Sequence, residues 1–260
     1  MNSLIINKII AGGFLVFISV ISKSQINDST IISADRPGMA TPPSIEAAKS
    51  LQLETGFSLE KNHLEKPFQE NIDYNFTLLR YGINKNSEIR LQTDYVQVKT
   101  DSANITGFDP LTIGTKIFIS EAKGIIPKTS FLFNLTLPYI GKKNFRPEYL
   151  APSIYLLMQN DITGKLNVCY NLGLEYDGES ASPAEFAAIC LGLGITDKVS
   201  GFIENYNWFS SASKPVNFVD LGFAYLVSHK IQLDLSGNMN LEDIKKYFMI
   251  NFGISWRIPI

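Results

Sequence analysis

The chain has 260 residues, of which 45% are hydrophobic, 12% aromatic and 18% charged. Its 23 basic and 25 acidic residues nearly balance and form no basic block, so nucleic acid is not an expected partner. This length suits one large all-β domain or two small ones.

The first 24 residues have the pattern of a secretory signal peptide. Lys8 provides a positive charge, Ile9 to Ile21 form an apolar core, and Ser22-Lys23-Ser24 is a small-x-small cleavage site. The alternative is a transmembrane anchor, which needs about 20 apolar residues. The apolar core is shorter than that, so we expect residues 1–24 to be removed during export.

Residues 25–50 form a separate segment ahead of the periodic part of the chain. Prolines interrupt it and no sustained period runs through it, which predicts a loop-like arm. Within it, Asp35 and Arg36 stand on a stiff turn. Two interpretations remain open: a periplasmic leader outside the fold, which we favour, or a plug whose Asp35 and Arg36 enter the lumen and pair with charges there.

From Leu51 onward the chain predicts twelve strands that form one domain over residues 51–260. Each segment alternates in polarity, is bounded by turn residues and has the roughly nine to eleven residues of a tilted membrane strand. The expected strands are 51–60, 72–82, 87–98, 110–119, 128–138, 150–161, 164–176, 184–194, 198–209, 216–227, 230–238 and 246–258. The alternation slips near Leu78-Leu79, Leu156-Leu157 and Phe202-Ile203, where we expect β-bulges or shifted boundaries.

The connections between these strands alternate between long and short. The long ones span 61–71, 99–109, 139–149, 177–183, 210–215 and 239–245. Membrane barrels have long extracellular loops and short periplasmic turns, whereas a soluble β-sandwich has no reason to sort lengths by parity. The pattern therefore favours an up-and-down antiparallel membrane β-barrel with both termini in the periplasm, and a soluble secreted β-protein is the alternative.

The last strand has the clearest division between two faces. One face carries Phe248, Ile250, Phe252, Ile254, Trp256 and Ile258, and the other Tyr247, Met249, Asn251, Gly253, Ser255 and Arg257. We expect the apolar face to contact lipid. We also expect this strand to pair with the first one, because a closed barrel leaves no open edge.

Several segments resemble a known protein family. They are ADRPGMATPPSIEAAKSLQLETGF (34–57), LLRYGINKNSEIRL (78–91), IGTKI (113–117), IENY (203–206) and the stretch from QLDLSGN to GISWRIP (232–259). In this order they resemble the MetA-pathway of phenol degradation family of outer-membrane transporters. The resemblance implies a β-barrel in the outer membrane of a Gram-negative bacterium, proposed to pass small solutes, hydrophobic or aromatic ones among them.

If the apolar faces contact lipid, the opposite faces line the lumen. The charged residues on those faces are Glu54, Arg80, Glu88, Arg90, Asp94, Lys116, Glu175, Glu204, Asp220, Asp234 and Arg257. Charges inside a narrow barrel must pair or stay hydrated. One interpretation is a salt-bridge lattice that fills the interior. The other is a selectivity constriction, in which the excess of acids favours cations or neutral polar solutes.

The two cysteines, Cys169 and Cys190, lie on neighbouring expected strands. A symmetric hairpin around 177–183 places them opposite one another, both facing inward. In an oxidising compartment a disulfide between them is one outcome, and two small buried thiols are the other.

No arrangement of residues indicates catalysis. His63 in an outward loop and His229 in a periplasmic turn are separated by the height of a barrel, about 25 Å, so they cannot share a catalytic or zinc site. We therefore expect no enzyme, no cofactor and no metal. A lipid-modifying barrel that uses His63 is one alternative, and an occluded structural or adhesion barrel that acts through its outward loops is another.

The sequence thus predicts a twelve-stranded outer-membrane barrel that serves as a passive channel for small solutes. The expected partners are outer-membrane lipid, a small-molecule solute and the barrel assembly machinery. Solute identity and oligomeric state do not follow from these patterns.

Overall fold

The computed structural model describes residues 31–64, 66–210 and 215–258. The predicted signal peptide lies outside these residues. The strands are β1 (Leu51–Asn62), β2 (Gln69–Asn84), β3 (Ser87–Thr100), β4 (Asn104–Phe108), β5 (Thr112–Ser120), β6 (Lys128–Thr136), β7 (Ala151–Asp161), β8 (Leu166–Glu175), β9 (Ala184–Gly194), β10 (Val199–Phe209), β11 (Val216–Ser228), β12 (Ile231–Asn240) and β13 (Tyr247–Ile258). A 3-10 helix spans Lys143–Phe145. None of the described segments is a helix of the length and apolarity needed to cross a bilayer.

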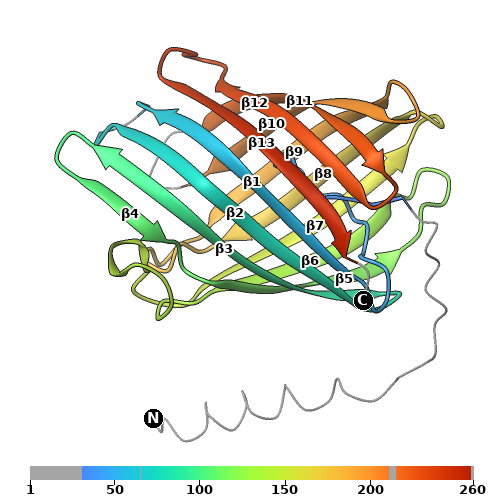
Figure 1. The fold of residues 1–260 in the computed structure, drawn as a ribbon, viewed down its shortest axis with the longest axis horizontal. Helices are drawn as coiled ribbons and strands as arrows, with labels where there is room; N and C mark the ends of the chain where they lie inside the picture. Colours follow the sequence, from blue (N-terminus) through green and yellow to red (C-terminus); the bar gives the residue numbers. More distant parts are fainter. Residues whose placement is uncertain (1–30, 65, 211–214, 259–260) are drawn as a thin grey trace, which may run out of the picture.

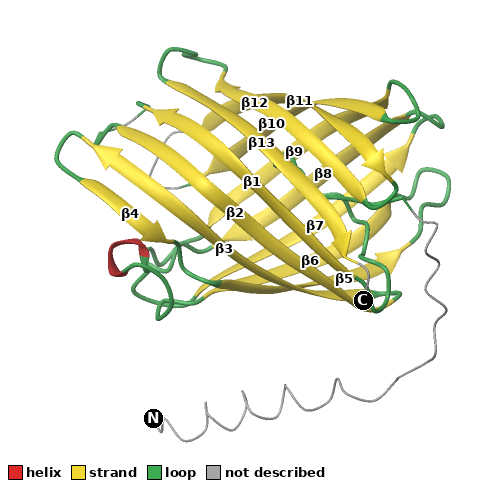
Figure 2. Ribbon diagram, in the orientation of Figure 1, coloured by secondary structure: helices red, strands yellow, loops and turns green. Residues whose placement is uncertain are grey.

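The strands form one closed antiparallel barrel (Figures 1 and 2). The first and last strands close it, with β1 and β13 paired from Leu51 opposite Ile258 to Asn62 opposite Tyr247. The expected closure by the C-terminal strand is therefore confirmed. Closure satisfies the backbone hydrogen bonds of both terminal strands, which a bilayer could not solvate.

The fourth position of the barrel is occupied by one interrupted strand. β5 pairs with residues 87–92 of β3, and β4 pairs with residues 95–99 of the same strand. Asp109, Pro110 and Leu111 separate the two parts, and proline has no backbone N–H for a ladder hydrogen bond. Counting β4 and β5 as one gives the predicted twelve strands.

The two faces of the strands are divided as the alternation predicted. On β13 the side chains of Phe248, Ile250, Phe252, Ile254 and Trp256 are 37–56% exposed on the outside. Tyr247, Asn251 and Ser255 alternate with them and are buried inside. The barrel thus has an apolar outer surface suited to lipid and a polar interior.

None of the three slips in alternation marks a β-bulge at its own position. β7 and β10 keep an unbroken register with both neighbours. β2 shifts its register between Asp73 and Asn75 and between Gly82 and Asn84 instead, and its boundaries are shifted from the expected 72–82 to Gln69–Asn84. The alternation slips because apolar side chains also face inward. Leu78 and Leu157 are 3% and 0% exposed, and Phe202 lies beside Gly38 inside the barrel.

The barrel has two distinct ends. The short-turn end carries the connections 85–86, 121–127, 162–165, 195–198 and 229–230, and the long-loop end carries the other connections between neighbouring barrel strands. The expected long loop 99–109 is wrong, because β4 lies within it and leaves only the turn 101–103 between β3 and β4. The described chain begins at the short-turn end, where the amide of Ile32 donates to the carbonyl of His229 at 2.8 Å. This end is periplasmic in barrels of this kind.

Candidate functional site

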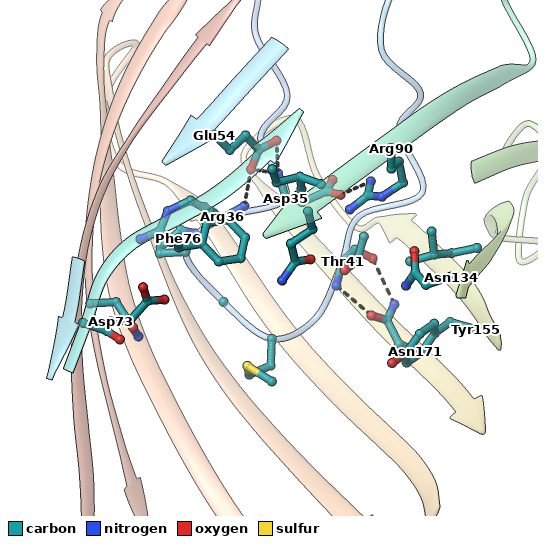
Figure 3. A pocket seen from close by; sticks show the side chains of 18 of the residues that line it. Asp35, Arg36, Thr41, Glu54, Asp73, Phe76, Arg90, Asn134, Tyr155 and Asn171 are labelled. Carbon is teal, nitrogen blue, oxygen red and sulfur yellow. Dashed lines mark hydrogen bonds and ion pairs between the residues drawn. The ribbon is translucent and has the colours of Figure 1, made fainter. Parts of the chain in front are cut away.

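Residues 32–50, which we call the arm, run through the inside of the barrel. Midway, the amide of Thr41 donates to Asn171 Oδ1 of β8 at 2.7 Å, and Asn171 Nδ2 donates back to the carbonyl of Thr41 at 3.0 Å. Figure 3 shows this contact, with Asp35 directed towards Arg90 across the same space. The favoured interpretation of the arm as a leader outside the fold is therefore wrong for these residues, because they find their hydrogen-bond partners in the lumen.

A buried cluster of three bases and three acids holds the start of the arm. We call it the charge cluster, and its members are Asp35, Glu54, Arg80, Glu88, Arg90 and Lys116. Asp35 Oδ1 lies 3.1 Å from Arg80 Nη1 and 2.9 Å from Lys116 Nζ, and Asp35 Oδ2 pairs with Arg90. The strands alone supply three bases and two acids, so the arm provides the carboxylate that balances the charge.

The pKa of Asp35 reflects these neighbours. Burial by itself raises the pKa of this carboxyl group. The positive charges of Arg80, Lys116 and Arg90 outweigh that effect and hold the pKa well below its usual value of 3.8. Asp35 is therefore ionised over the whole physiological range, and its attraction to the three bases persists there.

Two further ion pairs fix the arm to the wall. Arg36 Nη2 lies 3.1 Å from Asp234 Oδ1 of β12, and its guanidinium stacks over the ring of Phe76 at 5.2 Å. Glu46 Oε1 lies 2.7 Å from Arg257 Nε of β13. The arm is thus anchored by charge near both of its ends.

A slot between two glycines accommodates the Arg36 side chain. Gly56 of β1 and Gly253 of β13 lie opposite one another in the ladder. A Cβ atom added at Gly56 or Gly253 would come within 2.7 or 2.4 Å of the Arg36 guanidinium. Close approach of the guanidinium to the wall therefore requires glycine at both positions.

Wall carboxylates also bind the backbone of the arm. Glu54 accepts hydrogen bonds from the amides of Asp35 and Arg36. Glu204 of β10 accepts hydrogen bonds from the amides of Met39 and Ala40 at 2.8 and 2.7 Å. Glu88 accepts one from the backbone amide of Glu46. An irregular segment in the lumen would otherwise leave buried N–H groups unpaired, so these acids compensate for its missing secondary structure.

All eleven predicted lumen residues face inward, but three of them do not take part in these arm contacts. Asp94 accepts from the amide of Thr77 and from Gln92. Glu175 accepts from Trp208. Asp220 is fully buried and forms no ion pair with a described residue.

Aromatic residues line the wall opposite the charge cluster, and of these only Tyr247 was assigned to the lumen side from the sequence. Tyr155, Phe186, Trp208, Tyr206, Phe218 and Tyr247 form a continuous series of ring contacts with centroids 4.7–5.9 Å apart. They come from β7, β9, β10, β11 and β13. The alternation could have placed these aromatic residues in the lumen, because each lies in phase with the polar face of its strand.

Two cavities remain inside the barrel on either side of the arm. The long-loop cavity has a volume of about 440 Å³ and the short-turn cavity about 750 Å³. Asp35, Arg36, Pro37 and Gly38 line both. This part of the arm therefore lies between the two cavities, where a through-path would run.

Cys169 and Cys190 are directly opposite in the β8–β9 ladder, as the hairpin symmetry predicted. Both are free thiols in the structure, so the disulfide that this register allows is not formed. Cys169 Sγ lies 3.5 Å from the carbonyl of Thr41 in the arm, and both cysteines line the short-turn cavity.

The two histidines lie at opposite ends of the barrel. His63 stacks on Phe68 with ring centroids 4.8 Å apart at the long-loop end, and His229 lies in a short turn. Within the described part of the chain, no group of three or more His, Cys, Asp or Glu residues is arranged to hold a metal ion.

Comparison with known proteins identifies relatives of this barrel. The family model described as "Putative MetA-pathway of phenol degradation" matches residues 34–258. No curated protein matches the sequence. The structure is similar to the COG4313 outer membrane channel from Pseudomonas putida F1, with a TM-score of 0.66 and 12% identity over 86% of this chain and 99% of that chain.

Two other outer-membrane barrels are also similar. The KdgM porin in complex with disordered oligogalacturonate has a TM-score of 0.57 and 6% identity, over 80% of this chain and 99% of the porin. The translocator domain of autotransporter NalP from Neisseria meningitidis has a TM-score of 0.50 and 13% identity, over 82% of this chain and 90% of that domain. At these identities the likeness shows a shared fold, that of an outer-membrane channel-like barrel.

Proposed function

The chain belongs to this MetA-pathway of phenol degradation family, and from that premise we propose that it is an outer-membrane channel for small solutes whose lumen the arm closes. One observation carries the proposal: Asp35 to Gly38 line both cavities. A solute that crosses the barrel must pass this segment, so conduction requires the arm to move.

The chemistry of the anchors suits a movable segment. The arm is held by ion pairs and hydrogen bonds, and its exit from the wall would leave polar groups that water can solvate. Loss of Asp35 from the charge cluster leaves three wall bases against two wall acids. That imbalance favours the return of the arm. The arm therefore acts as a reversible gate.

The proposed channel favours cations and neutral polar solutes. Each base of the charge cluster is paired with an acid, and so are Arg36 of the arm and Arg257 of β13. Two acids that line the long-loop cavity, Asp73 and Glu175, form no ion pair with a described residue. Unpaired carboxylates along a narrow path attract cations and repel anions.

Conductance in planar bilayers tests the gate. The full-length wild-type protein should be closed for most of the recording, and the double variant Asp35→Asn, Arg36→Gln should open in steps. Breaking buried ion pairs costs about 3–5 kcal/mol, so we expect the open fraction to rise at least ~100-fold. Under a KCl gradient, the reversal potential of the open variant should indicate cation preference.

The matched control removes an ion pair that is exposed. Glu70 and Lys99 pair at 3.2 Å with more than half of each side chain exposed, so the double variant Glu70→Gln, Lys99→Gln should conduct like the wild type. Heat-modifiable gel migration verifies that each variant is folded. If the folded arm variant gives no steps at any voltage, the barrel is an occluded structural one and the channel proposal is wrong.

A further inference from the structure

The long-loop cavity contains a carboxylate surrounded by aromatic side chains. Glu175 at the end of β8 lines the cavity together with Tyr155 of β7 and Phe186 of β9. Trp208 Nε1 donates to Glu175 Oε2 at 3.2 Å, and the Tyr155 hydroxyl interacts with the same carboxyl group. These neutral donors orient Glu175, and no described Lys or Arg forms an ion pair with it.

The rings beside Glu175 form an angular wall. The planes of Tyr155 and Phe186 meet at 82° with centroids 5.9 Å apart, and Phe186 contacts Trp208 at 5.3 Å. Aromatic faces attract cations through their quadrupole, most strongly where water is displaced. Figure 3 shows Asp73 on the side of the cavity opposite Tyr155, which adds a second carboxylate without an ion pair to the lining.

The guanidinium groups in the lining do not favour an anion. Arg90 is committed to Asp35 and Glu88, and Arg36 pairs with Asp234. The Nε atom of Arg36 has no hydrogen-bond partner among the described residues, but it lies against Gly253 in the slot of the wall. An anionic ligand would therefore meet free carboxylates and no free base.

The lining also fits a metal ion poorly. Hard metal ions require several oxygen ligands around one point, and the described residues contain no such group. A single carboxylate beside aromatic rings is instead the arrangement that recognises ammonium groups with an apolar body.

We propose that the long-loop cavity binds a small organic cation. The ammonium group lies beside Glu175, and the apolar part of the molecule packs against Tyr155 and Phe186. The volume of about 440 Å³ accommodates a molecule of one ring or a short chain. The inference rests on the proposed channel function for the route by which a solute enters the lumen, and it names the class of that solute.

A series of three probes with one ring and different charges tests the inference. Benzylammonium, benzyl alcohol and benzoate are titrated into the full-length protein in detergent, with Trp208 fluorescence as the readout. The chain has two tryptophans, so the Trp256→Phe background leaves Trp208 as the reporter. Benzylammonium should quench the Trp208 fluorescence in a saturable manner and bind at least ~10-fold more tightly than benzyl alcohol. The reason is the cation–π and Coulomb attraction of its ammonium group, which benzoate cannot gain.

Glu175→Gln separates charge from shape, because glutamine still accepts a hydrogen bond from Trp208. Benzylammonium should bind this variant about 10-fold more weakly, with benzyl alcohol unchanged. Glu185→Gln is the matched control, since Glu185 is exposed on the next strand and should leave both affinities unaltered.

The binding measurement is independent of conduction. If benzylammonium binds with the expected charge preference but no variant conducts, the cation site stands and the channel proposal fails. If the channel conducts but the three probes bind alike, or not at all, the cation site is wrong. Equal benzylammonium affinity in Glu175→Gln and wild type also overturns it.

Discussion

The two halves of the lumen use the same kinds of side chain in opposite ways. Around the arm, Arg80, Lys116, Glu54 and Glu88 are 0% exposed and each has an oppositely charged partner. In the long-loop half, carboxylates without an ion pair face aromatic rings. The paired half holds a segment in place, and the half with unpaired acids is available to a solute.

The difference follows from how burial changes the cost of charge. A fully buried charge is costly without a close counter-ion, so the members of the charge cluster depend on one another. Asp73 and Glu175 line a cavity and are only partly buried, so leaving them without a counter-ion costs less. Variants in the first half should therefore have large effects on stability, and variants in the second half small and local ones.

The largest expected effect is the loss of the central base of the charge cluster. Arg80→Met leaves Glu54 and Glu88 buried without the guanidinium that contacts both. The free energy of unfolding in detergent should fall by about 3–5 kcal/mol. Unfolding in increasing guanidinium chloride, with heat-modifiable gel migration as the readout, measures this free energy.

Lys99→Met is the control for that change. Its partner Glu70 is 55% exposed, so the cost should stay below about 1 kcal/mol. Equal losses in the two variants would contradict the claim that burial sets the cost of breaking an ion pair.

A smaller effect is expected from filling the glycine slot. Gly253→Ala places a methyl group within 2.4 Å of Arg36 Nε, which should displace Arg36 and weaken the arm by about 1–3 kcal/mol. The open fraction in planar bilayers should rise about 10-fold. Gly237→Ala is the control, because the nearest atom to a Cβ added at Gly237 is 3.7 Å away. This variant should conduct like the wild type. Similar traces from the Gly253 and Gly237 variants would contradict the requirement for glycine beside Arg36.

The smallest expected effect concerns the junction between β4 and β5. Burial, together with the negative charge of Asp94, raises the pKa of Asp109 from 3.8 to about 6. The folded junction thus holds this proton more tightly than the unfolded chain does. Its stability is retained at low pH and is lost as the pH rises from about 4 to above 6.

Hydrogen exchange across residues 104–112 measures this change, since the amide of Asp109 donates to the carbonyl of Asp94 at 2.8 Å. At pH 7.5 the Asp109→Asn variant should exchange a few-fold more slowly than the wild type, because it has no charge to bury. At pH 4 the two should match. Asp101→Asn, on the exposed tip of the same hairpin, should leave the exchange rate unchanged at both pH values. If Asp109→Asn differs from the wild type only at pH 4, the assigned direction of the pH dependence is wrong.

Patterns along the chain were sufficient to predict the barrel and its two faces. Alternation along 246–258 predicted which residues of β13 face outward, and the long and short connections predicted which ends lie together. The midpoint of the loop between β8 and β9 placed Cys169 opposite Cys190. These features are local, since a strand repeats every two residues and a hairpin is symmetric about its turn.

What occupies the lumen depends instead on contacts between residues that are far apart in the chain. The bases that bind Asp35 come from strands up to 81 positions away, Arg36 pairs across 198 positions, and Glu204 binds the arm across 165. An irregular segment has no period from which its course can be calculated, and its partners are set by which side chains converge after the barrel closes. For the same reason, the division of the lumen acids into paired and unpaired groups depends on the path of the arm, because the arm supplies the missing charges for one group and leaves the other free.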